Sequence, residues 1–245
     1  MEMRKCRIFA VILLSMIMFE LAAAAGNNMS LPPEAFLNLS RQRAALQNSF
    51  ADMRGKITHL RRNQGGARYY PLRFLIRFGK EKVQAKLILN GVEQHYFERD
   101  IWLKRKSVTK SEPADNTLLE QLGFRIGDLA MEFLDYPVKR ELAPETLKTV
   151  HCRVLLLTAP DGKIVKVWIS SEYMFPLKAE FFANADALTE APLRSLEITG
   201  FKKIDNYYVA SDIALFCADF RSRVTFDQCL VQNADTAQLS DEFDL

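Results

Sequence analysis

In the stretch Val165-Lys166-Val167-Trp168-Ile169-Ser170, the residues Val165, Val167 and Ile169 fall on one side of a strand, and Lys166 and Ser170 fall on the other. A period of two gives a strand one apolar face and one wetter face. The same period recurs in short runs, separated by turn residues, and this predicts an antiparallel meander. The apolar face of a meander must be covered by helices, a second sheet or a ligand. The matching apolar sets are Leu177, Ala179 and Phe181; Leu196 and Ile198; Ile213 and Leu215; and Val224 and Phe226.

A second group of strands precedes this one in the chain. Residues Tyr70–Phe78 alternate strongly, with Arg73 and Arg77 on the face opposite the apolar residues. Residues Val83–Leu89 return in the same way, and Asn90-Gly91 is the strongest hairpin-turn signal in the sequence. We therefore expect two meanders. Their apolar positions here are Leu72, Phe74, Ile76 and Phe78, then Val83, Ala85, Leu87 and Leu89.

Helical periodicity occurs in two places. Apolar residues recur at threes, fours and sevens from Pro33 to about Phe50, which predicts a helix that begins at the proline. Leu118–Leu134 has the same spacing but contains two glycines, so two short helices are expected there. Lys104–Asn116 is interpreted as a connection, and Pro144-Glu145 as the start of one more turn. The order of helix, strands, helical insertion and strands predicts one α+β domain.

The first residues have the form of a secretory signal peptide. A basic start (Met1–Arg7) precedes the short apolar run Ile8–Phe19, and small residues end at Ala25. Cleavage before Gly26 is expected, because the apolar run is shorter than the roughly 20 residues that a membrane span needs. An uncleaved N-terminal anchor is the alternative. The sequence thus divides into a signal peptide (1–25), one domain (26–232) and an acidic C-terminal tail (233–245).

The charge of the exported chain is close to neutral. Without residues 1–25 it has 30 basic and 28 acidic residues, a net charge of +2. Nothing in this balance favours nucleic acid as a partner. The basic residues Lys104, Arg105, Lys106 and Lys110 are interpreted as a solvated surface run, with contact to anionic lipid heads as the alternative.

The cysteines and histidines do not form a recognisable reactive centre in the sequence. Of the three cysteines beyond the signal peptide, Cys217 and Cys229 lie on neighbouring strands. Matching the apolar residues of those strands places Leu230 inward and Cys229 on the opposite side from Cys217, so we expect no disulfide unless a bulge shifts the register. Neither the cysteines nor the histidines have metal-ligand spacing, and no nucleophile or phosphate-binding motif is present. The sequence therefore predicts no metal, no cofactor and no enzymatic activity. The histidines are His59, His95 and His151.

A family resemblance rests on several of these segments together. Val165–Ser170 is followed by Phe175-Pro176-Leu177-Lys178-Ala179-Glu180 and later by Phe201-Lys202-Lys203-Ile204-Asp205. This succession resembles the LolA-like family of outer-membrane lipoprotein-sorting proteins, which has a tryptophan-bearing strand, a proline-leucine-lysine strand and a strand end with lysine-isoleucine-aspartate. Arg125-Ile126-Gly127-Asp128-Leu129 looks like the start of the family's helical segment. The resemblance covers residues Pro33–Val231.

The resemblance implies a fold and a function. The fold is a strongly curved antiparallel sheet, an incomplete β-barrel, covered by an N-terminal helix and a helical lid. In the family's carriers the apolar concave face holds acyl chains, and each CH₂ removed from water contributes about 0.8 kcal/mol. A periplasmic location, lipoprotein acyl chains or another lipid as the ligand, and inner- and outer-membrane envelope proteins as partners are also implied. The expected cavity wall consists of Leu72, Phe74, Ile76, Val83, Leu87, Val165, Val167, Ile169, Phe181 and Ile198.

The family's carriers also hold the lid shut with an arginine early in the meander. Arg77 falls in the corresponding strand, and Arg73 is an equal candidate on the same face; a plain surface role is the alternative for both. The chain departs from the carriers here, because it has Gly79-Lys80 where they have a lysine-arginine-proline motif.

Three functions follow as hypotheses. The first is a soluble envelope carrier of lipoprotein acyl chains or another lipid. The second is a lipid-sensing or protein-binding envelope scaffold with the same fold and no transport role. The third and least favoured is an exported hydrolase, which would require a cluster of carboxylates or a serine–histidine contact inside a pocket.

Overall fold

The computed structural model describes residues 30–46, 48–63, 65–100, 107–205, 207–237 and 243. The expected signal peptide and the basic residues 104–106 lie outside them. One antiparallel sheet runs through the described part, in the order β5-β4-β3-β2-β1-β12-β11-β10-β9-β8-β7-β6. The two predicted meanders are joined in it, because β1 pairs with β12. The strands are β1 (Ser49–Arg61), β2 (Arg68–Phe78), β3 (Lys82–Leu89), β4 (Glu93–Asp100), β5 (Val108–Glu112), β6 (Val138–Leu147), β7 (Val150–Thr158), β8 (Ile164–Ser170), β9 (Pro176–Phe182), β10 (Arg194–Ile204), β11 (Tyr207–Cys217) and β12 (Phe220–Asn233).

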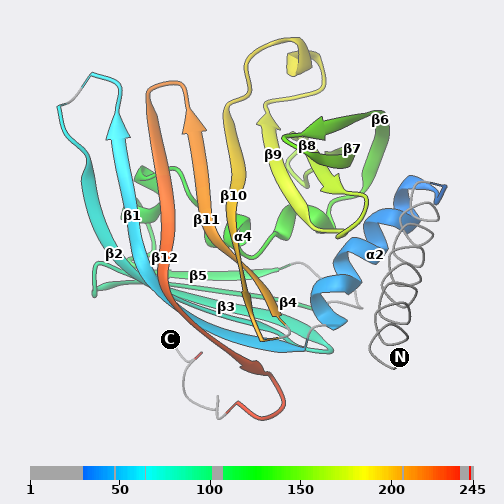
Figure 1. Ribbon diagram of the computed structural model, residues 1–245. Coiled ribbons are helices and arrows are strands. Elements are labelled where there is room, and N and C mark those ends of the chain that lie inside the picture. The colour runs from blue at the N-terminus through cyan, green and yellow to red at the C-terminus, as the bar shows by residue number, and fades with distance from the viewer. Residues whose placement is uncertain are drawn as a thin grey trace, which may run out of the picture.

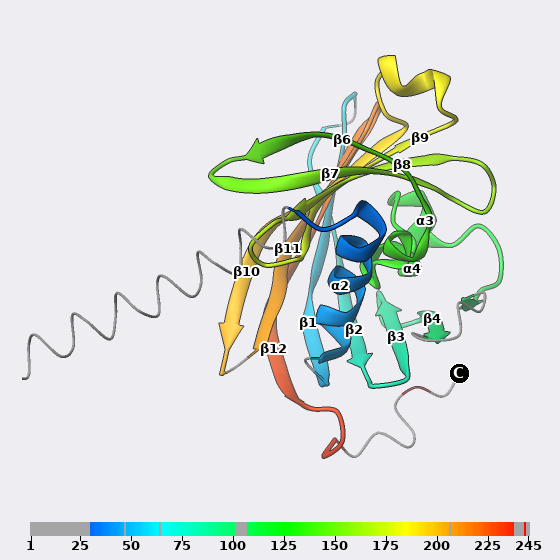
Figure 2. The same cartoon turned by 90° about the vertical axis from the view of Figure 1, so that its right-hand side faces the viewer.

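The sheet curves around one of its faces and is not closed, since β5 and β6 form its two edges (Figure 1). Figure 2 shows α2, α3 and α4 on the enclosed side, between the two wings of the sheet. This is the α+β arrangement that the sequence predicts. In the described part of the chain, no helix is long and apolar enough to cross a membrane. The helices are α2 (Pro33–Leu46), α3 (Leu118–Gln121), α4 (Ile126–Leu129) and the 3₁₀ helices η1 (Glu132–Asp135) and η2 (Asp186–Thr189).

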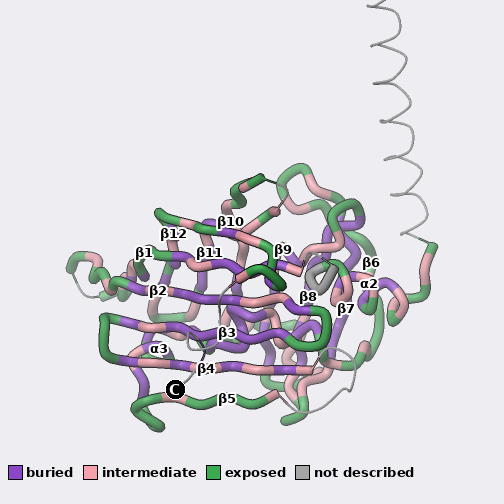
Figure 3. The backbone as a smooth tube through the Cα atoms, turned by 90° about the horizontal axis from the view of Figure 1, so that it is seen from below, coloured by how far each residue is buried: buried purple, intermediate pink, exposed green. Residues whose placement is uncertain are grey.

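The main apolar core lies between the helices and the enclosed face of the sheet, which is called the inner face below. Alternate residues of the strands point to it, as Phe74 (2% exposed) and Val167 (0%) do. Buried segments run along the middle strands in Figure 3, and exposed segments lie mainly in the turns and at the edge strand β5. Smaller clusters cover the opposite, outer face. One of them joins Phe50 and Leu75 to Phe243, whose ring centroid lies 6.2 Å from that of Phe50.

Several predicted elements need correction. The N-terminal helix ends at Leu46 and does not extend to Phe50. Phe50 lies in β1, and its side chain packs with Leu75 on the outer face of the sheet. The expected connection Lys104–Asn116 contains β5, a polar strand that pairs with β4 along one edge. Pro144-Glu145 does not start a turn but lies in β6, where a register shift accommodates the proline at a sheet edge.

A β-bulge explains a second correction. The register between β1 and β12 shifts at Arg54/Gly55, so that Asp227 has no partner on β1. Beyond this bulge the inward and outward positions of β12 are exchanged: Cys229 packs against the main core, and Leu230 is 61% exposed. Cys229 therefore shares the inner face with Cys217, contrary to the sequence-based assignment. Both thiols are free, as is that of Cys152.

The predicted hairpin turn at Asn90-Gly91 is confirmed. Both residues have positive φ, 54° and 78°, as the tight turn that favours the right-handed strand twist requires. The turn holds β3 and β4 in a register that places Leu87 opposite His95.

Candidate functional site

The structure places all ten residues of the expected cavity wall in the main core cluster on the inner face. Nine of them are buried, the most exposed being Phe181 at 8%, and Ile198 is partly buried. They come from β2, β3, β8, β9 and β10, so both wings of the sheet contribute. Alternation in the sequence was sufficient to find this surface, because every strand that contributes has a period of two.

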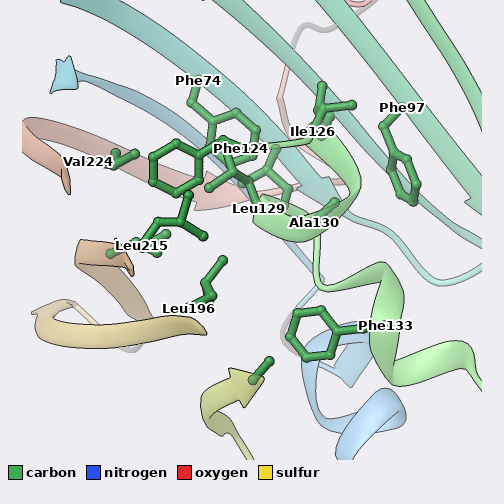
Figure 4. Close-up of a cluster of buried hydrophobic side chains, with 14 of the residues drawn as sticks. Phe74, Phe97, Phe124, Ile126, Leu129, Ala130, Phe133, Leu196, Leu215 and Val224 are labelled. Atoms are coloured by element: carbon green, nitrogen blue, oxygen red, sulfur yellow. The ribbon is translucent and has the colours of Figure 1, made fainter. Parts of the chain in front are cut away.

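The helical segment between β5 and β6, residues 118–135, covers this wall. Phe124 is completely buried, and Phe133 stands edge-on to Phe181 with 6.1 Å between the ring centroids. Figure 4 shows Phe124, Ile126 and Leu129 directed toward residues of the inner face such as Phe74 and Leu215. The side chains of the protein itself thus occupy the apolar space in this structure.

A buried ion pair ties this segment to the sheet. Asp128 of α4 accepts two hydrogen bonds from the guanidinium of Arg194 on β10, one of them at 2.9 Å from Nη2 to Oδ1. The side chains are only 8% and 15% exposed. Asp128 Oδ2 also accepts from the backbone N–H of Arg125 at 3.0 Å, and the Arg194 guanidinium lies 3.9 Å from the ring centroid of Phe181. One arginine therefore contacts the helical segment and the apolar wall at once.

The arginines expected to hold this segment lie elsewhere. Arg73 and Arg77 are on the outer face of β2, opposite the residues that the helices cover. Arg73 forms a two-fold ion pair with Asp52 on β1, at 3.0 and 2.8 Å. Besides Arg99 of β4, which pairs with Asp135, the structure brings Arg194 of β10 to the helical segment. Sequence reasoning missed it because it lies 66 residues from its partner and near the end of a strand.

Glu93 anchors the other end of the helical segment. Its carboxylate accepts the backbone N–H groups of Leu118 and Leu119 at 2.6 and 2.9 Å, and so satisfies the first donors of α3. His95 Nε2 lies 2.6 Å from the same carboxylate, and its Nδ1 lies 2.8 Å from Ser111 Oγ on the edge strand. Glu93 and His95 are almost completely buried. This polar group fixes α3 against β4 and β5.

Polar contacts hold helix α2 to the turn after β8 and to η1 of the helical segment. Ser40 Oγ donates to the carbonyl of Met174 at 2.8 Å, and Arg41 Nε donates to the carbonyl of Leu134 at 2.5 Å. Burial lowers the pKa of Arg41, although Asp135 counteracts this. Near the start of the helix, the guanidinium of Arg153 lies 4.4 Å from the ring centroid of Phe36. Two buried apolar residues, Phe36 and Leu37, complete the contact.

The serine–histidine contacts in the core have structural roles. His59 Nδ1 lies 2.9 Å from Ser222 Oγ, but that hydroxyl donates to the carbonyl of Leu122 at 2.7 Å, which commits its proton. Burial and two nearby arginines lower the pKa of His59. Because the Ser222 proton is committed to Leu122, the Nδ1–H of His59 donates to Ser222 Oγ. In the other contact, the carboxylate that orients His95 is occupied by the amides of α3. Among the described residues, no group of three or more potential metal ligands occurs.

A surface pocket of about 600 Å³ lies away from the wall. It opens between the β6–β7 turn and the turn after β8, and none of the ten wall residues lines it. Its polar residues are engaged locally: Thr146 Oγ1 lies 3.1 Å from His151 Nδ1, and Glu145 accepts from the indole of Trp168 at 2.8 Å. Glu145 also accepts a hydrogen bond from Lys166 at 3.1 Å, and the hydrogen bonds from Trp168 and Lys166 lower the pKa of Glu145. The pocket is therefore separate from the inner face.

Comparison with known proteins bears on this architecture. No protein-family model matches the chain, and no curated protein sequence matches it significantly. Solved structures do match it. A protein domain from Vibrio parahaemolyticus, named as an outer membrane lipoprotein-sorting domain, has a TM-score of 0.64 at 15% identity, covering 85% of this chain and 94% of that one. A LolA superfamily protein from Nitrosomonas europaea has a TM-score of 0.51 at 18% identity, covering 82% and 93%. The chain has a LolA-like fold.

A third similar structure is that of a DUF1329 family protein from Desulfovibrio piger. Its TM-score is 0.62 at 10% identity, and the match covers 88% of this chain and 98% of that chain. The resemblance stated for the sequence is thus confirmed at the level of the fold. At these identities the similarity concerns the fold alone.

Proposed function

We propose that this protein is an exported carrier that binds the acyl chains of lipoproteins, or another lipid, on the inner face of its sheet. The observation that carries the proposal is a continuous apolar wall, built from both wings of the sheet and covered by a separate helical segment. An acyl chain needs such a dry surface to cross an aqueous compartment, because each buried CH₂ contributes about 0.8 kcal/mol.

In this proposal the helical segment is a lid that exchanges its own side chains for the hydrocarbon. Phe124 and Phe133 occupy the place that a bound chain would take. The segment is attached at several points, among them the Asp128–Arg194 pair, the Glu93 carboxylate and the hydrogen bond from Ser222 to the Leu122 carbonyl.

The partly buried end of the inner face offers a route of entry. Ile198, Ile204 and Val209 line the lower part of β10 and β11 and are only partly covered. A chain that entered here would meet the buried wall residues next, because Ile198 and Leu196 point to the same face.

The setting that we propose is the periplasm, reached through cleavage of the signal peptide before Gly26. Donor and acceptor partners would then be inner- and outer-membrane envelope proteins, and the ligand a lipoprotein acyl chain or another lipid. The proposed role is not enzymatic and does not involve nucleic acid, consistent with a net charge near zero.

A titration with a fluorescent fatty acid, cis-parinaric acid, tests the proposal. Wild-type protein should bind it saturably. Ile198→Asp should weaken binding by about tenfold or more, because a carboxylate on the route of the chain must be desolvated. Leu230→Asp is the matched control, since Leu230 is 61% exposed on the outer face. Equal affinity of the two variants, both shown to be folded, would contradict the proposal.

A scaffold that binds another envelope protein is the second candidate. It is favoured by the degree to which Phe124 and its neighbours fill the inner face. Purification from the envelope distinguishes the two candidates: a stoichiometric protein partner without lipid supports the scaffold, and bound lipid supports the carrier.

A further inference from the structure

The far half of the β10–β11 hairpin forms a two-stranded arm outside the rest of the sheet. Pairing of β10 with β9 stops at Glu197, and pairing of β11 with β12 covers only Asp212–Phe216. Beyond these points, residues 201–204 and 207–210 pair only with each other in the described part of the chain. Figure 2 shows this end of β10 and β11 extending away from β9.

Two irregularities at the base direct the arm away from its neighbours. The register of the hairpin shifts on both sides of Gly200, and such bulges bend and twist a strand. A Cβ atom at Gly200 would lie 2.5 Å from Asp212 Oδ2 and 3.1 Å from Asp212 Cβ, so a larger residue here would have to displace the Asp212 side chain. On β12, the carbonyl of Phe226 accepts a hydrogen bond from Lys202 Nζ at 2.9 Å, which ties the arm to the sheet at this point.

The outer side of the arm is aromatic and basic. Cross-strand pairing places Phe201 opposite Ala210 and Lys203 opposite Tyr208, so these four residues share one face, called the arm face below. Phe201 is 44% exposed and Tyr208 is 60% exposed. The ammonium of Lys203 lies 5.8 Å from the ring centroid of Tyr208. Phe201 is held at the base by Phe175, with 5.3 Å between the ring centroids.

This combination is unfavourable in water and favourable at a bilayer surface. An isolated two-stranded hairpin is marginally stable, and large exposed rings add a cost that contact with a partner would remove. Tyrosine and lysine are amphipathic: the ring or stem enters the acyl boundary while the hydroxyl or ammonium stays among the head groups. Lys203 is the charged residue of the arm face, and its ammonium complements anionic lipid heads, whereas Lys202 lies on the other side and donates to the Phe226 carbonyl.

We propose that the arm face docks on a lipid bilayer surface that contains anionic head groups. The other side of the same arm carries Ile204 and Val209, which continue the partly buried end of the inner face. Docking would therefore bring this partly buried end of the inner face close to the membrane. This extends the proposed carrier function by naming the surface from which an acyl chain is taken or to which it is given.

Flotation with lipid vesicles tests the docking surface without any cargo. The protein is purified after export and delipidated, and its N-terminus is determined by mass spectrometry so that residues 1–25 do not contribute to binding. It is mixed with vesicles of phosphatidylcholine alone or with about one third phosphatidylglycerol. We expect wild-type protein to float with the mixed vesicles, more weakly with phosphatidylcholine alone, and less as the salt concentration rises.

Matched variants locate the contact. Tyr208→Ser and Phe201→Ser should each reduce flotation several-fold, and Lys203→Glu should reduce it mainly on the anionic vesicles. Tyr69→Ser and Phe216→Ser are the controls, because Tyr69 is 64% exposed and Phe216 is 38% exposed on other parts of the surface. All five proteins are first compared with wild type by circular dichroism.

Two results would overturn the inference: wild-type protein that does not float with either vesicle, or controls that lose as much binding as the arm variants. Absence of flotation would indicate that the arm face binds a protein and not a bilayer. The fatty-acid titration described above separates this failure from failure of the carrier proposal, because it contains no vesicles and its variants lie outside the arm face.

Discussion

At the scale of single residues, Asp128 and Arg194 connect the helical segment to the sheet. Asp128 is almost completely buried and Arg194 is mostly buried, and a charge in such a place is tolerated only when it is paired and hydrogen-bonded. Asp128 also accepts the Arg125 amide, so one carboxylate shapes the start of α4 and fixes α4 to β10. The residues of this contact are common types far apart in sequence, which is why the contact had no signal there.

Replacing Arg194 should destabilise the protein, because Asp128 would stay buried without its partner. Arg194→Met keeps the length of the side chain but leaves Asp128 buried without a counter-ion. We expect the free energy of unfolding to fall by about 3 kcal/mol, measured by urea denaturation. Arg223→Met is the control, since Arg223 pairs with Asp212 but is 54% exposed, and it should cost less than about 1 kcal/mol. Similar losses in the two variants would show that burial does not govern the Asp128 pair.

Tyr136 should make the free energy of unfolding depend on pH. Burial raises the pKa of the Tyr136 hydroxyl well above its ordinary value. The unfolded chain ionises this tyrosine from about pH 10, whereas the folded protein keeps the proton, so stability is lost as the pH rises above that value. Between pH 9 and pH 11, the free energy of unfolding should fall in both proteins, but by up to about 1 kcal/mol less in Tyr136→Phe than in wild type. Urea denaturation at the two pH values measures this difference. Identical losses would contradict a buried hydroxyl at this position.

At the scale of elements, strands with a clear period of two were predictable and irregular ones were not. Leu72, Phe74 and Val167 showed their faces in the sequence because packing on one side of a sheet imposes that period. β5 was missed because an edge strand such as Val108–Glu112 is polar on both faces. The bulge at Asp227 was missed because nothing local marks it, and the assignment of Cys229 and Leu230 was therefore exchanged.

The bulge itself can be tested through the glycine opposite it. A Cβ atom at Gly55 would lie 1.9 Å from the carbonyl oxygen of Thr225, a backbone atom that cannot move without shifting β12. Gly55→Ala should lower the free energy of unfolding by about 1–3 kcal/mol. Gly65→Ala is the control, because no atom lies within 4 Å of the added Cβ, and it should stay within about 0.5 kcal/mol of wild type. A Gly55→Ala protein as stable as this control would contradict the close approach of β1 and β12.

At the scale of the whole molecule, the fold brings together three features that are separate in sequence. The apolar wall comes from both meanders, the covering segment comes from the insertion between them, and the arm comes from the last hairpin. The sequence located the wall because its signal is periodic. It did not locate the attachment of the covering segment or the arm, because these depend on where neighbouring strands stop pairing.

The central claim is that the covering segment can leave the wall and a hydrocarbon chain can take its place. Native mass spectrometry of the protein purified from the envelope measures this directly, before and after extraction with organic solvent, with the Arg194→Met variant beside wild type. We expect a lipid-sized mass increment that extraction removes, and that added fatty acid restores more readily in Arg194→Met than in wild type. A bare protein mass in both forms, unchanged when fatty acid is added, would contradict it.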